Sequence, residues 1–245
     1  MIFVCMATYN GAKFLREQLD SILTQLDESA KIIVADDGST DGTLEILREY
    51  AARDAKGAAR VQLIPAAGHP LGPIYNLERS LQEAYKQSNG DDLIFLADQD
   101  DVWMPGKVKR MVEALQNSAL AVHDAYLLQE LYEGVFERGD RLSEIRPFAK
   151  GLFKNWFKNR YTGCCMALRC ELLDKALPFP KKLPMHDQWL GMIAEKFFDV
   201  AYVDSPLINY RQHKKNATHI AGSGAGVIQK LKWRLDLLRA FWWRR

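Results

Sequence analysis

Residues 93–101 read Leu-Ile-Phe-Leu-Ala-Asp-Gln-Asp-Asp, an apolar run of five residues followed at once by three carboxylates within four positions. Short apolar runs of this kind are typical of strands buried in a parallel sheet. In such a sheet, ligands bind beyond the carboxyl ends of the strands. The stretch therefore predicts both a buried strand and a functional edge of the sheet.

The segments before this stretch alternate between strand and helix patterns. Strands are predicted at 2–6, 31–35, 61–64 and 93–97, and helices at 12–26, 43–52 and 75–86. Pro105 stands at a position that favours the start of a further helix. The second half is less regular, with strands predicted at 120–128 and 164–168 and a helix at 188–198. This alternation favours an α/β fold with a mostly parallel sheet covered by helices.

Composition is typical of one large globular domain, or one domain with an appendage. The 245 residues are 48% hydrophobic and 26% charged, with a formal net charge of +2. This balance excludes an acidic disordered chain and a generally basic protein, so no nucleic-acid partner is expected. No apolar stretch is long enough to span a bilayer, and residues 1–5 lack the basic region of a signal peptide, so we expect a cytoplasmic protein. The four cysteines lack metal-ligand spacing and are expected to be reduced.

The small net charge conceals an acidic body and a basic C-terminal segment. Residues 214–245 carry eight Lys or Arg and one acid, which leaves 25 basic against 30 acidic residues elsewhere. A linker is predicted at 217–226, before a helical tail at 227–245. One apolar row of this tail contains Ile228, Leu231, Leu235, Leu238 and Trp242, and a second contains Trp233, Leu237 and Phe241.

Tryptophan and arginine together are typical of a membrane–water interface. The tail therefore predicts peripheral docking on the inner face of the plasma membrane. The alternative is that the tail packs on the body or on a partner subunit, and an oligomer is compatible with the sequence.

Three carboxylates this close together repel one another unless a cation lies between them. Asp98 and Asp100 flank one residue after the strand, so both can reach a common point, and oxygen ligands suit Mg²⁺ or Mn²⁺. The alternative is a solvated acidic turn before the next helix, a role that suits Asp101. Polar clusters also follow the first two strands, at 7–10 and 36–42. Three clusters at strand ends predict one shared site.

Together these motifs resemble family 2 glycosyltransferases of the GT-A fold. Residues 162–167 (Thr-Gly-Cys-Cys-Met-Ala) and 186–189 (His-Asp-Gln-Trp) are similar to the acceptor-side loop and the catalytic-base motif of that family. Residues 98–103 and 210–216 are similar to its bacterial rhamnosyltransferase-like branch, which makes surface polysaccharide and O-antigen. The resemblance implies a GT-A domain over 1–216, with a nucleotide-sugar-binding half at 1–104 and an acceptor-binding half at 105–216.

The resemblance also implies roles for the matching residues. Asp187 would be the general base. The ligands of a Mn²⁺ or Mg²⁺ ion would be Asp100, Asp98 and His213. The nucleotide sugar would contact Thr8, Tyr9, Asn10, Asp36, Asp37, Asp98, Gln99 and Arg211. The acceptor side would contain Trp103, Gly163, Cys164, His186 and Trp189.

The residues alone leave alternatives to three of these roles. Asp187 could cap the helix that follows it, and His213 could lie in a surface loop. Trp103 and Trp189 could belong to the core instead of an acceptor wall.

The implied activity is an inverting, metal-dependent transfer of rhamnose or a hexose to a hydroxyl of a lipid-linked or polysaccharide acceptor. The donor would be a dTDP or UDP sugar, and a single base candidate predicts a single displacement. A phosphatase would carry the D-x-D-x-V motif after its first strand, not the fourth, and a nucleotidyltransferase would need a glycine-rich basic loop after strand one. A non-catalytic membrane scaffold is the remaining alternative, although Asp100, Asp187 and Arg211 are all present.

Overall fold

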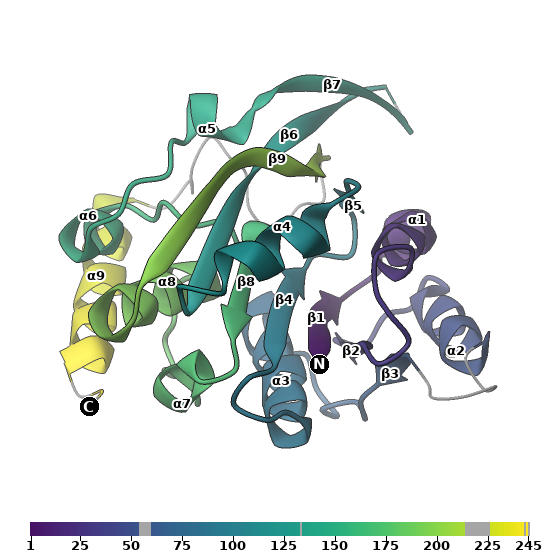
Figure 1. The fold of residues 1–245 in the computed structure, drawn as a ribbon, viewed down its shortest axis with the longest axis horizontal. Coiled ribbons are helices and arrows are strands. Elements are labelled where there is room, and N and C mark those ends of the chain that lie inside the picture. The colour runs from purple at the N-terminus through teal and green to yellow at the C-terminus, as the bar shows by residue number, and fades with distance from the viewer. Residues whose placement is uncertain (54–59, 133, 214–225, 243, 245) are drawn as a thin grey trace.

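The fold is built on one mixed sheet with helices around it (Figure 1). The computed structural model describes residues 1–53, 60–132, 134–213, 226–242 and 244. Within them a nine-stranded sheet runs in the order β3-β2-β1-β4-β8-β6-β9-β5, with β7 paired to β6. The α/β architecture predicted from the alternation is confirmed.

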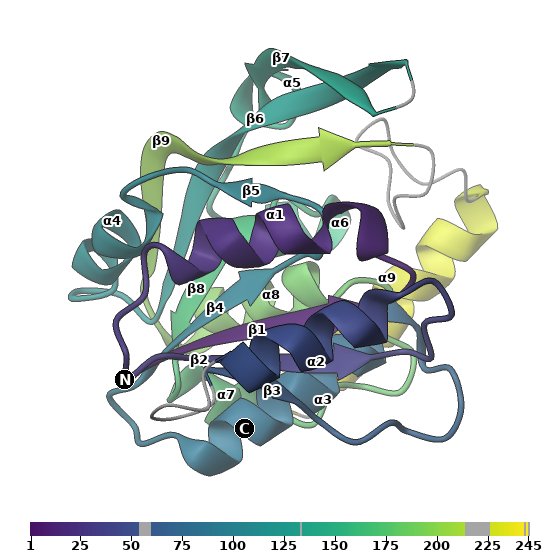
Figure 2. The ribbon, with the colours of Figure 1, turned by 90° about the vertical axis from the view of Figure 1, so that its right-hand side faces the viewer.

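The N-terminal half contains the parallel part of the sheet. Its strands are β1 (Ile2–Thr8), β2 (Lys31–Asp36), β3 (Val61–Leu63) and β4 (Leu93–Ala97), and all three pairings among them are parallel. The connecting helices are α1 (Ala12–Leu23), α2 (Thr43–Arg53) and α3 (Gly72–Gln87). Figure 2 shows α1 and α3 on opposite sides of β1. β1 and β4 are covered from both sides, which explains their uniformly apolar sequences.

The second half of the sheet is mixed. It contains β5 (Val102–Trp103), β6 (Leu120–Tyr132), β7 (Val135–Arg141), β8 (Met166–Arg169) and β9 (Val200–Gln212). β8 runs antiparallel to both β4 and β6, whereas β6 and β9 are parallel. β7 and β9 are half exposed and interrupted by charged residues, so their sequences lack the apolar runs that identified the other strands.

The helices of this half are mostly short. They are α4 (Lys107–Ala114), α5 (Leu142–Ile145), α6 (Leu152–Phe157), α7 (Leu172–Ala176), α8 (His186–Phe197) and α9 (Val227–Trp242), with a 3₁₀ turn at Gly163–Cys165. α4 begins two residues after Pro105, because Gly106 in the left-handed region precedes its first turn.

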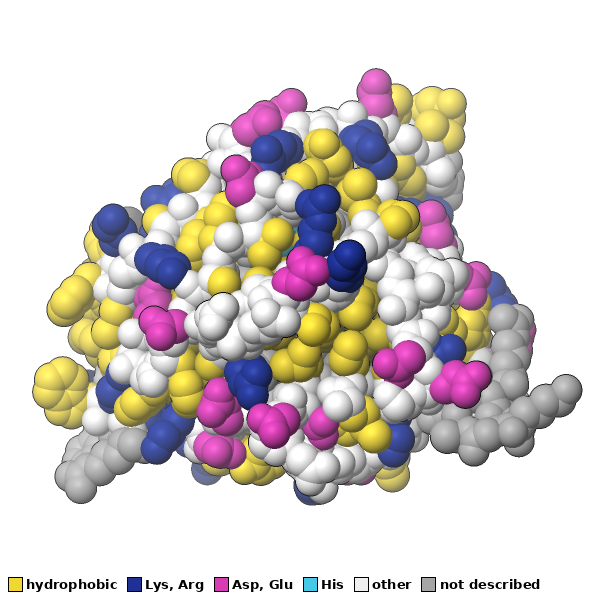
Figure 3. Space-filling model, viewed as in Figure 1, with side chains coloured by type: hydrophobic (Ala, Val, Ile, Leu, Met, Phe, Trp, Pro, Cys, Tyr) yellow, Lys and Arg dark blue, Asp and Glu magenta, His cyan; other side chains and the backbone are white. Residues whose placement is uncertain are grey.

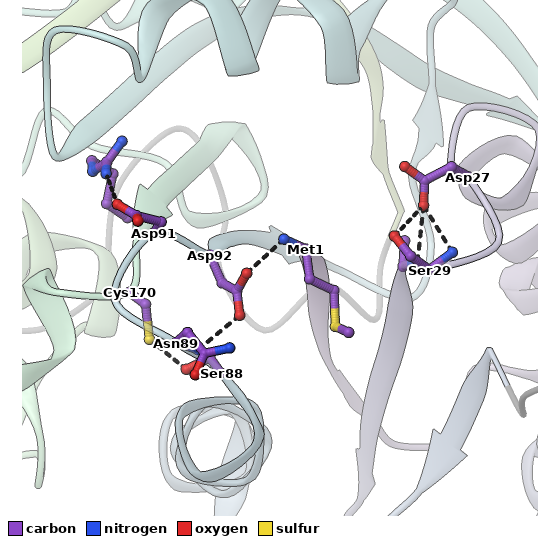
Figure 4. Close-up of polar contacts among 10 residues, drawn as sticks. Met1, Asp27, Ser29, Ser88, Asn89, Asp91, Asp92 and Cys170 are labelled. Atoms are coloured by element: carbon purple, nitrogen blue, oxygen red, sulfur yellow. Dashed lines mark hydrogen bonds and ion pairs between the residues drawn. The ribbon is translucent and has the colours of Figure 1, made fainter.

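Acidic turns precede β2 and β4 at the end of the sheet away from the predicted site (Figure 4). Asp27 accepts hydrogen bonds from Ser29 N at 2.9 Å and Ser29 Oγ at 2.6 Å. Asp92 accepts from the Met1 amine at 2.5 Å and from Asn89 N at 2.8 Å. Helix α1 ends at Leu23 with Thr24 as its C-cap, three residues before the predicted end.

The tail helix α9 packs on the body. Leu237 and Phe241 of the second apolar row are buried, and Trp156 Nε1 of α6 donates to the Arg234 carbonyl at 2.9 Å. Apart from Gly226, the predicted linker at 217–226 lies outside the described residues. Among the residues that are described, no helix has the length and apolar content to cross a membrane.

Candidate active site

A cavity of about 470 Å³ opens at the carboxyl ends of β1, β2 and β4. That volume is typical of a small-molecule site. β1 and β4 are in register with Met6 opposite Ala97, so residues 98–100 emerge beside residues 7–9. The lining residues are Ala7, Thr8, Tyr9, Asp37, Pro70, Gly72, Pro73, Asn76, Leu77, Asp98, Gln99, Asp100, His186 and Tyr210. All three polar clusters therefore meet at one site, as predicted. A second recess, of about 20 Å³, has room for no more than a water molecule.

Asp36 supports the wall of this cavity from behind. It is buried and accepts from Thr8 Oγ1 at 2.7 Å and Ser39 Oγ at 2.6 Å, and from the backbone N–H groups of Gly38 and Ser39. Asn10 also has a local task, since its Oδ1 accepts from Thr40 N at 2.8 Å. Neither residue lines the cavity, and their role as nucleotide contacts stays a prediction.

Asp37 faces the cavity and also shapes it. Its carboxylate accepts from Leu71 N at 2.7 Å and from Gly72 N at 2.9 Å. Gly72 has a φ of +76°, a conformation that favours glycine. The loop and first turn that Asp37 holds supply five lining residues that the sequence reading treated only as a connection: Pro70, Gly72, Pro73, Asn76 and Leu77.

Gln99 links the polar cluster at 98–101 to the one at 7–10. Its amide accepts from Tyr9 N at 2.9 Å and donates to Tyr9 O at 3.0 Å. A Cβ at Gly11 would lie 2.3 Å from Gln99 Oε1, so a larger residue there would displace the Gln99 amide from these two hydrogen bonds. Both Tyr9 and Gln99 line the cavity.

Asp98 is the most perturbed carboxyl group in the cavity. Its surface reaches solvent, yet the surrounding protein and the neighbouring carboxylates Asp100 and Asp187 raise its pKa to about 7. This arrangement stores electrostatic repulsion that a cation would relieve. Asp187 is therefore close enough to Asp98 to act on its charge.

Two buried groups, Asp101 and Cys164, lie behind Asp98. Ligand atoms of Asp98, Asp101 and Cys164 are all within 4.8 Å of one another. Burial raises the pKa of Asp101, and a hydrogen bond with Cys165 together with burial raises that of the Cys164 thiol. Cys164 was predicted on the acceptor side, but the structure buries it beneath the site.

Lys107 is a residue that sequence reading missed. Its side chain is fully buried, with Nζ donating to the Cys164 carbonyl at 2.9 Å and lying 4.0 Å from the centre of the Trp103 ring. Burial lowers its pKa to about 8. A lysine in the first turn of an amphipathic helix gives no sequence signal of burial, because most such lysines are solvated.

Arg211 and His213 approach the acidic cluster from β9. His213 Nε2 lies 2.8 Å from Asp100 Oδ2, so this predicted pair of metal ligands is brought together. The Arg211 guanidinium donates to the Asp100 carbonyl and to Glu17 Oε2, and packs against the rings of Phe14 and Phe136. It does not line the cavity, and its predicted contact with the diphosphate stays a prediction.

Asp187 is buried in the first turn of α8 and does not itself line the cavity. Its Oδ1 accepts from Asn159 Nδ2 at 2.8 Å and from Gln188 N at 2.7 Å, although Met185 and not Asp187 occupies the N-cap position. Next to it His186 lines the cavity, and burial lowers its pKa. A Cβ at Gly163 would lie 2.5 Å from His186 Nε2, so Gly163 allows the two loops to approach.

Trp103 and Trp189 belong to the core. Both are buried; Trp103 packs on Phe95 with ring centres 5.7 Å apart, and Trp189 Nε1 donates to the Ala176 carbonyl. The structure therefore supports the alternative that both tryptophans belong to the core, and not the prediction that they form a wall on the acceptor side.

The donor set in the cavity fits a hard divalent cation. Asp98 and Asp100 both line it, and their mutual repulsion is evident in the raised pKa of Asp98. The buried Cys164 sulfur is a soft ligand held as a thiol, which suits neither Mg²⁺ nor Mn²⁺. Asp98, Asp100 and His213 therefore remain the better ligand set.

Comparison with known proteins places this geometry in context. A dTDP-rhamnosyl transferase, RfbG of Shigella flexneri, is 27% identical over 249 residues, covering 98% of this chain and 81% of the relative. An uncharacterized glycosyltransferase of Nostoc is 30% identical over 239 residues, covering 94% and 70%.

Solved structures share the fold. Staphylococcus aureus TarS 1–349 in complex with UDP-GlcNAc has a TM-score of 0.67 at 19% identity, covering 99% of this chain and 67% of that one. The mannosyltransferase PcManGT of Pyrobaculum calidifontis, in complex with GDP-Man and Mn²⁺, has a TM-score of 0.61, also at 19% identity, covering 88% and 58%.

The sequence model of glycosyl transferase family 2 matches residues 3–177, from the first strand through the acceptor-side loop. That range contains all three polar clusters of the cavity, and it covers well over half of the chain. The chain is a glycosyltransferase and belongs to glycosyl transferase family 2.

Proposed function

We propose that the chain transfers a sugar from a nucleoside diphosphate sugar to a hydroxyl group with inversion at the anomeric carbon. The observation that carries this proposal is the position of Asp187: it directly follows His186, which lines the cavity, it is held by Asn159, and its charge contributes to the raised pKa of Asp98. A single base facing a cation-binding pair of carboxylates suits a single displacement. The relative from Shigella favours dTDP-rhamnose as donor, and a UDP-hexose is the alternative.

Each wall of the cavity has a task in this reaction. Thr8, Tyr9 and Asp37 would bind the nucleoside, and Asp98 and Asp100 would hold Mn²⁺ or Mg²⁺ beside the diphosphate. The cation would stabilise the negative charge that develops on the leaving diphosphate. Both hydrogen bonds described for the Asp187 carboxylate reach Oδ1, so we assign Oδ2 to the proton of the acceptor hydroxyl. His186, neutral because its pKa is lowered, would line the acceptor side.

The acceptor that we propose is a lipid-linked or polysaccharide intermediate of bacterial surface glycan synthesis. The support is the Shigella relative, which is similar over 98% of this chain.

The test measures nucleoside diphosphate release from a panel of dTDP and UDP sugars, with Mn²⁺, with Mg²⁺ and with a chelator. Asp187→Asn should lower turnover by about 10²–10⁴-fold with donor binding retained, because it removes only the base. Asp174→Asn is the matched control, since Asp174 is an exposed acid in the first turn of α7. Near-normal turnover of Asp187→Asn, or a product with retained anomeric configuration, would overturn the proposal.

A further inference from the structure

The two apolar rows of α9 have different environments. Leu237 and Phe241 are buried against the body, as described above. On another side of the helix, Ile228 is 84% exposed and Trp242 81% exposed, and Leu231 and Leu235 are also exposed. At ~100° per residue these four side chains fall on one face. An apolar row therefore remains on the surface after the helix has packed.

Helix α6 adds a second exposed row beside the first. Phe153 is 81% exposed and Phe157 is also exposed, and their i, i+4 spacing puts them on one face of the helix. Arg234 of α9 lies 4.1 Å from the centre of the Phe157 ring and donates two hydrogen bonds to the Phe157 carbonyl. The two rows thus belong to one surface, which we call the α6–α9 surface.

The rim of this surface is basic. Exposed lysines and an arginine accompany both rows: Lys150, Lys154, Lys158, Lys232 and Arg239. Residues 148–160 contain no acid, and Asp236 is the one acid in residues 226–242. Figure 3 shows hydrophobic side chains protruding at the left edge, over α6 and α9, with Lys and Arg side chains nearby.

We propose that the α6–α9 surface docks on an anionic lipid bilayer. Bulky apolar side chains that project singly from two helices can enter the headgroup region, while long basic side chains reach the phosphates around them. A row of lysines with almost no acids is complementary to anionic lipid, whereas a protein interface depletes lysine at its core. The surface includes α6, so it extends beyond the C-terminal segment in which the sequence predicted membrane contact.

The α6–α9 surface is also connected to the catalytic side of the molecule. Asn159, two residues after α6, donates to the Asp187 carboxylate, and the carbonyls of Asn155 and Trp156 accept from Gln188 Nε2. Docking through α6 would bring a lipid-linked hydroxyl to the side of the cavity that contains Asp187. This consequence, unlike the docking itself, rests on the function proposed above.

The test is co-sedimentation of the full chain with vesicles, without donor or metal. We expect pelleting with phosphatidylcholine vesicles that contain about 30% phosphatidylserine, and release when salt is raised to about 0.5 M. Phe153→Ser combined with Phe157→Ser should lower the partition coefficient by about tenfold or more, because two apolar anchors are lost. Lys154→Gln and Lys158→Gln should each lower the partition coefficient by about fivefold.

The matched control removes apolar side chains elsewhere. Leu131→Ser with Tyr132→Ser changes two exposed residues at the end of β6 and should leave binding unchanged. Point variants are preferable to deletion of α9, because deletion would expose the core that Leu237 and Phe241 cover.

Three results would overturn the docking proposal. The first is that the native chain pellets equally with and without vesicles. The second is that the phenylalanine double variant binds vesicles as well as the native chain does. The third is that the native chain does not bind vesicles and the phenylalanine double variant converts a dimer to a monomer. Failure of docking with intact nucleoside diphosphate release on a water-soluble acceptor leaves the proposed function standing. Vesicle binding without any sugar transfer would reject that function and leave docking standing.

Discussion

The two ends of β4 both carry acidic residues, and the structure treats them in opposite ways. At the N-terminal end, Asp92 is paired with the Met1 amine and Asn89 N, and Asp91 is 3.0 Å from the Arg169 guanidinium. Each of these carboxylates has a positive or N–H partner. They fix where the strand begins and leave nothing for a ligand to satisfy.

At the C-terminal end Asp100 is paired with His213 and Asp101 accepts from Arg211 N, whereas Asp98 lies beside other carboxylates. Asp98 has its pKa raised to about 7 by the enclosing protein and by Asp100 and Asp187. The buried Lys107 donates to the Cys164 carbonyl instead of to a carboxylate. The difference teaches that Asp92, which the chain itself satisfies, serves the fold, whereas Asp98, which lies in the repulsion of two other carboxylates, indicates a site for a cation.

The largest effect is expected from substituting one carboxylate at each end of β4 and comparing the two variants. Asp100→Asn should weaken Mn²⁺-dependent donor binding by about a hundredfold or more, an effect that even the loss of an outer partner of a metal can reach. Asp92→Asn should leave donor binding intact and lower the free energy of unfolding by about 1 kcal/mol, because it weakens one partly buried hydrogen bond. Titration calorimetry and chemical denaturation measure the two quantities, and equal loss of binding in both variants would break the comparison.

The next effect concerns Lys107. Its pKa is about 8 in the folded chain against a reference value of 10.5, so between these values the unfolded chain binds more protons. The free energy of unfolding should therefore rise with pH over this interval, relative to Lys107→Met, by on the order of 2 kcal/mol. Denaturant titrations of both proteins with a chelator, from pH 7.5 to about 10, test this. If the free energies of unfolding of the two proteins changed with pH in parallel, burial would not shift the pKa of Lys107.

The smallest effect is the pH dependence of metal affinity. A cation competes with the proton on Asp98, so the affinity for Mn²⁺ should fall about tenfold per pH unit below about 7 and level off above it. Calorimetry at pH 6, 7 and 8 measures this, and Asp98→Asn should flatten the dependence while it weakens binding. An affinity that does not change between pH 6 and 8 would contradict the assignment of Asp98.

Much of the molecule could be predicted from local pattern. The strand at 93–97 is confirmed to the residue, and the other three parallel strands match within one or two residues, because a strand buried on both faces must be apolar along its whole length. The convergence of residues 7–10, 36–42 and 98–101 could also be predicted from the sequence, because the carboxyl ends of parallel strands meet at the same edge of the sheet.

The errors occurred where a side chain's surroundings come from distant parts of the chain. Arg211 was expected at the diphosphate, and its guanidinium packs against Phe14 and Phe136 outside the cavity lining. Trp103 and Trp189 were expected to face an acceptor and are buried. In each case the residue type suits both positions, so no local signal separates them.

The sequence by itself determined the parallel half of the sheet, the edge where ligands bind and the acidic residues at that edge, because these follow from the period and polarity of short segments. Only the tertiary structure decided which carboxylates are satisfied by the chain, that a lysine is buried behind them, and which row of α9 stays exposed. Those properties depend on pairing across more than a hundred residues, such as Asp100 with His213, and on desolvation that exists only once the layers have packed.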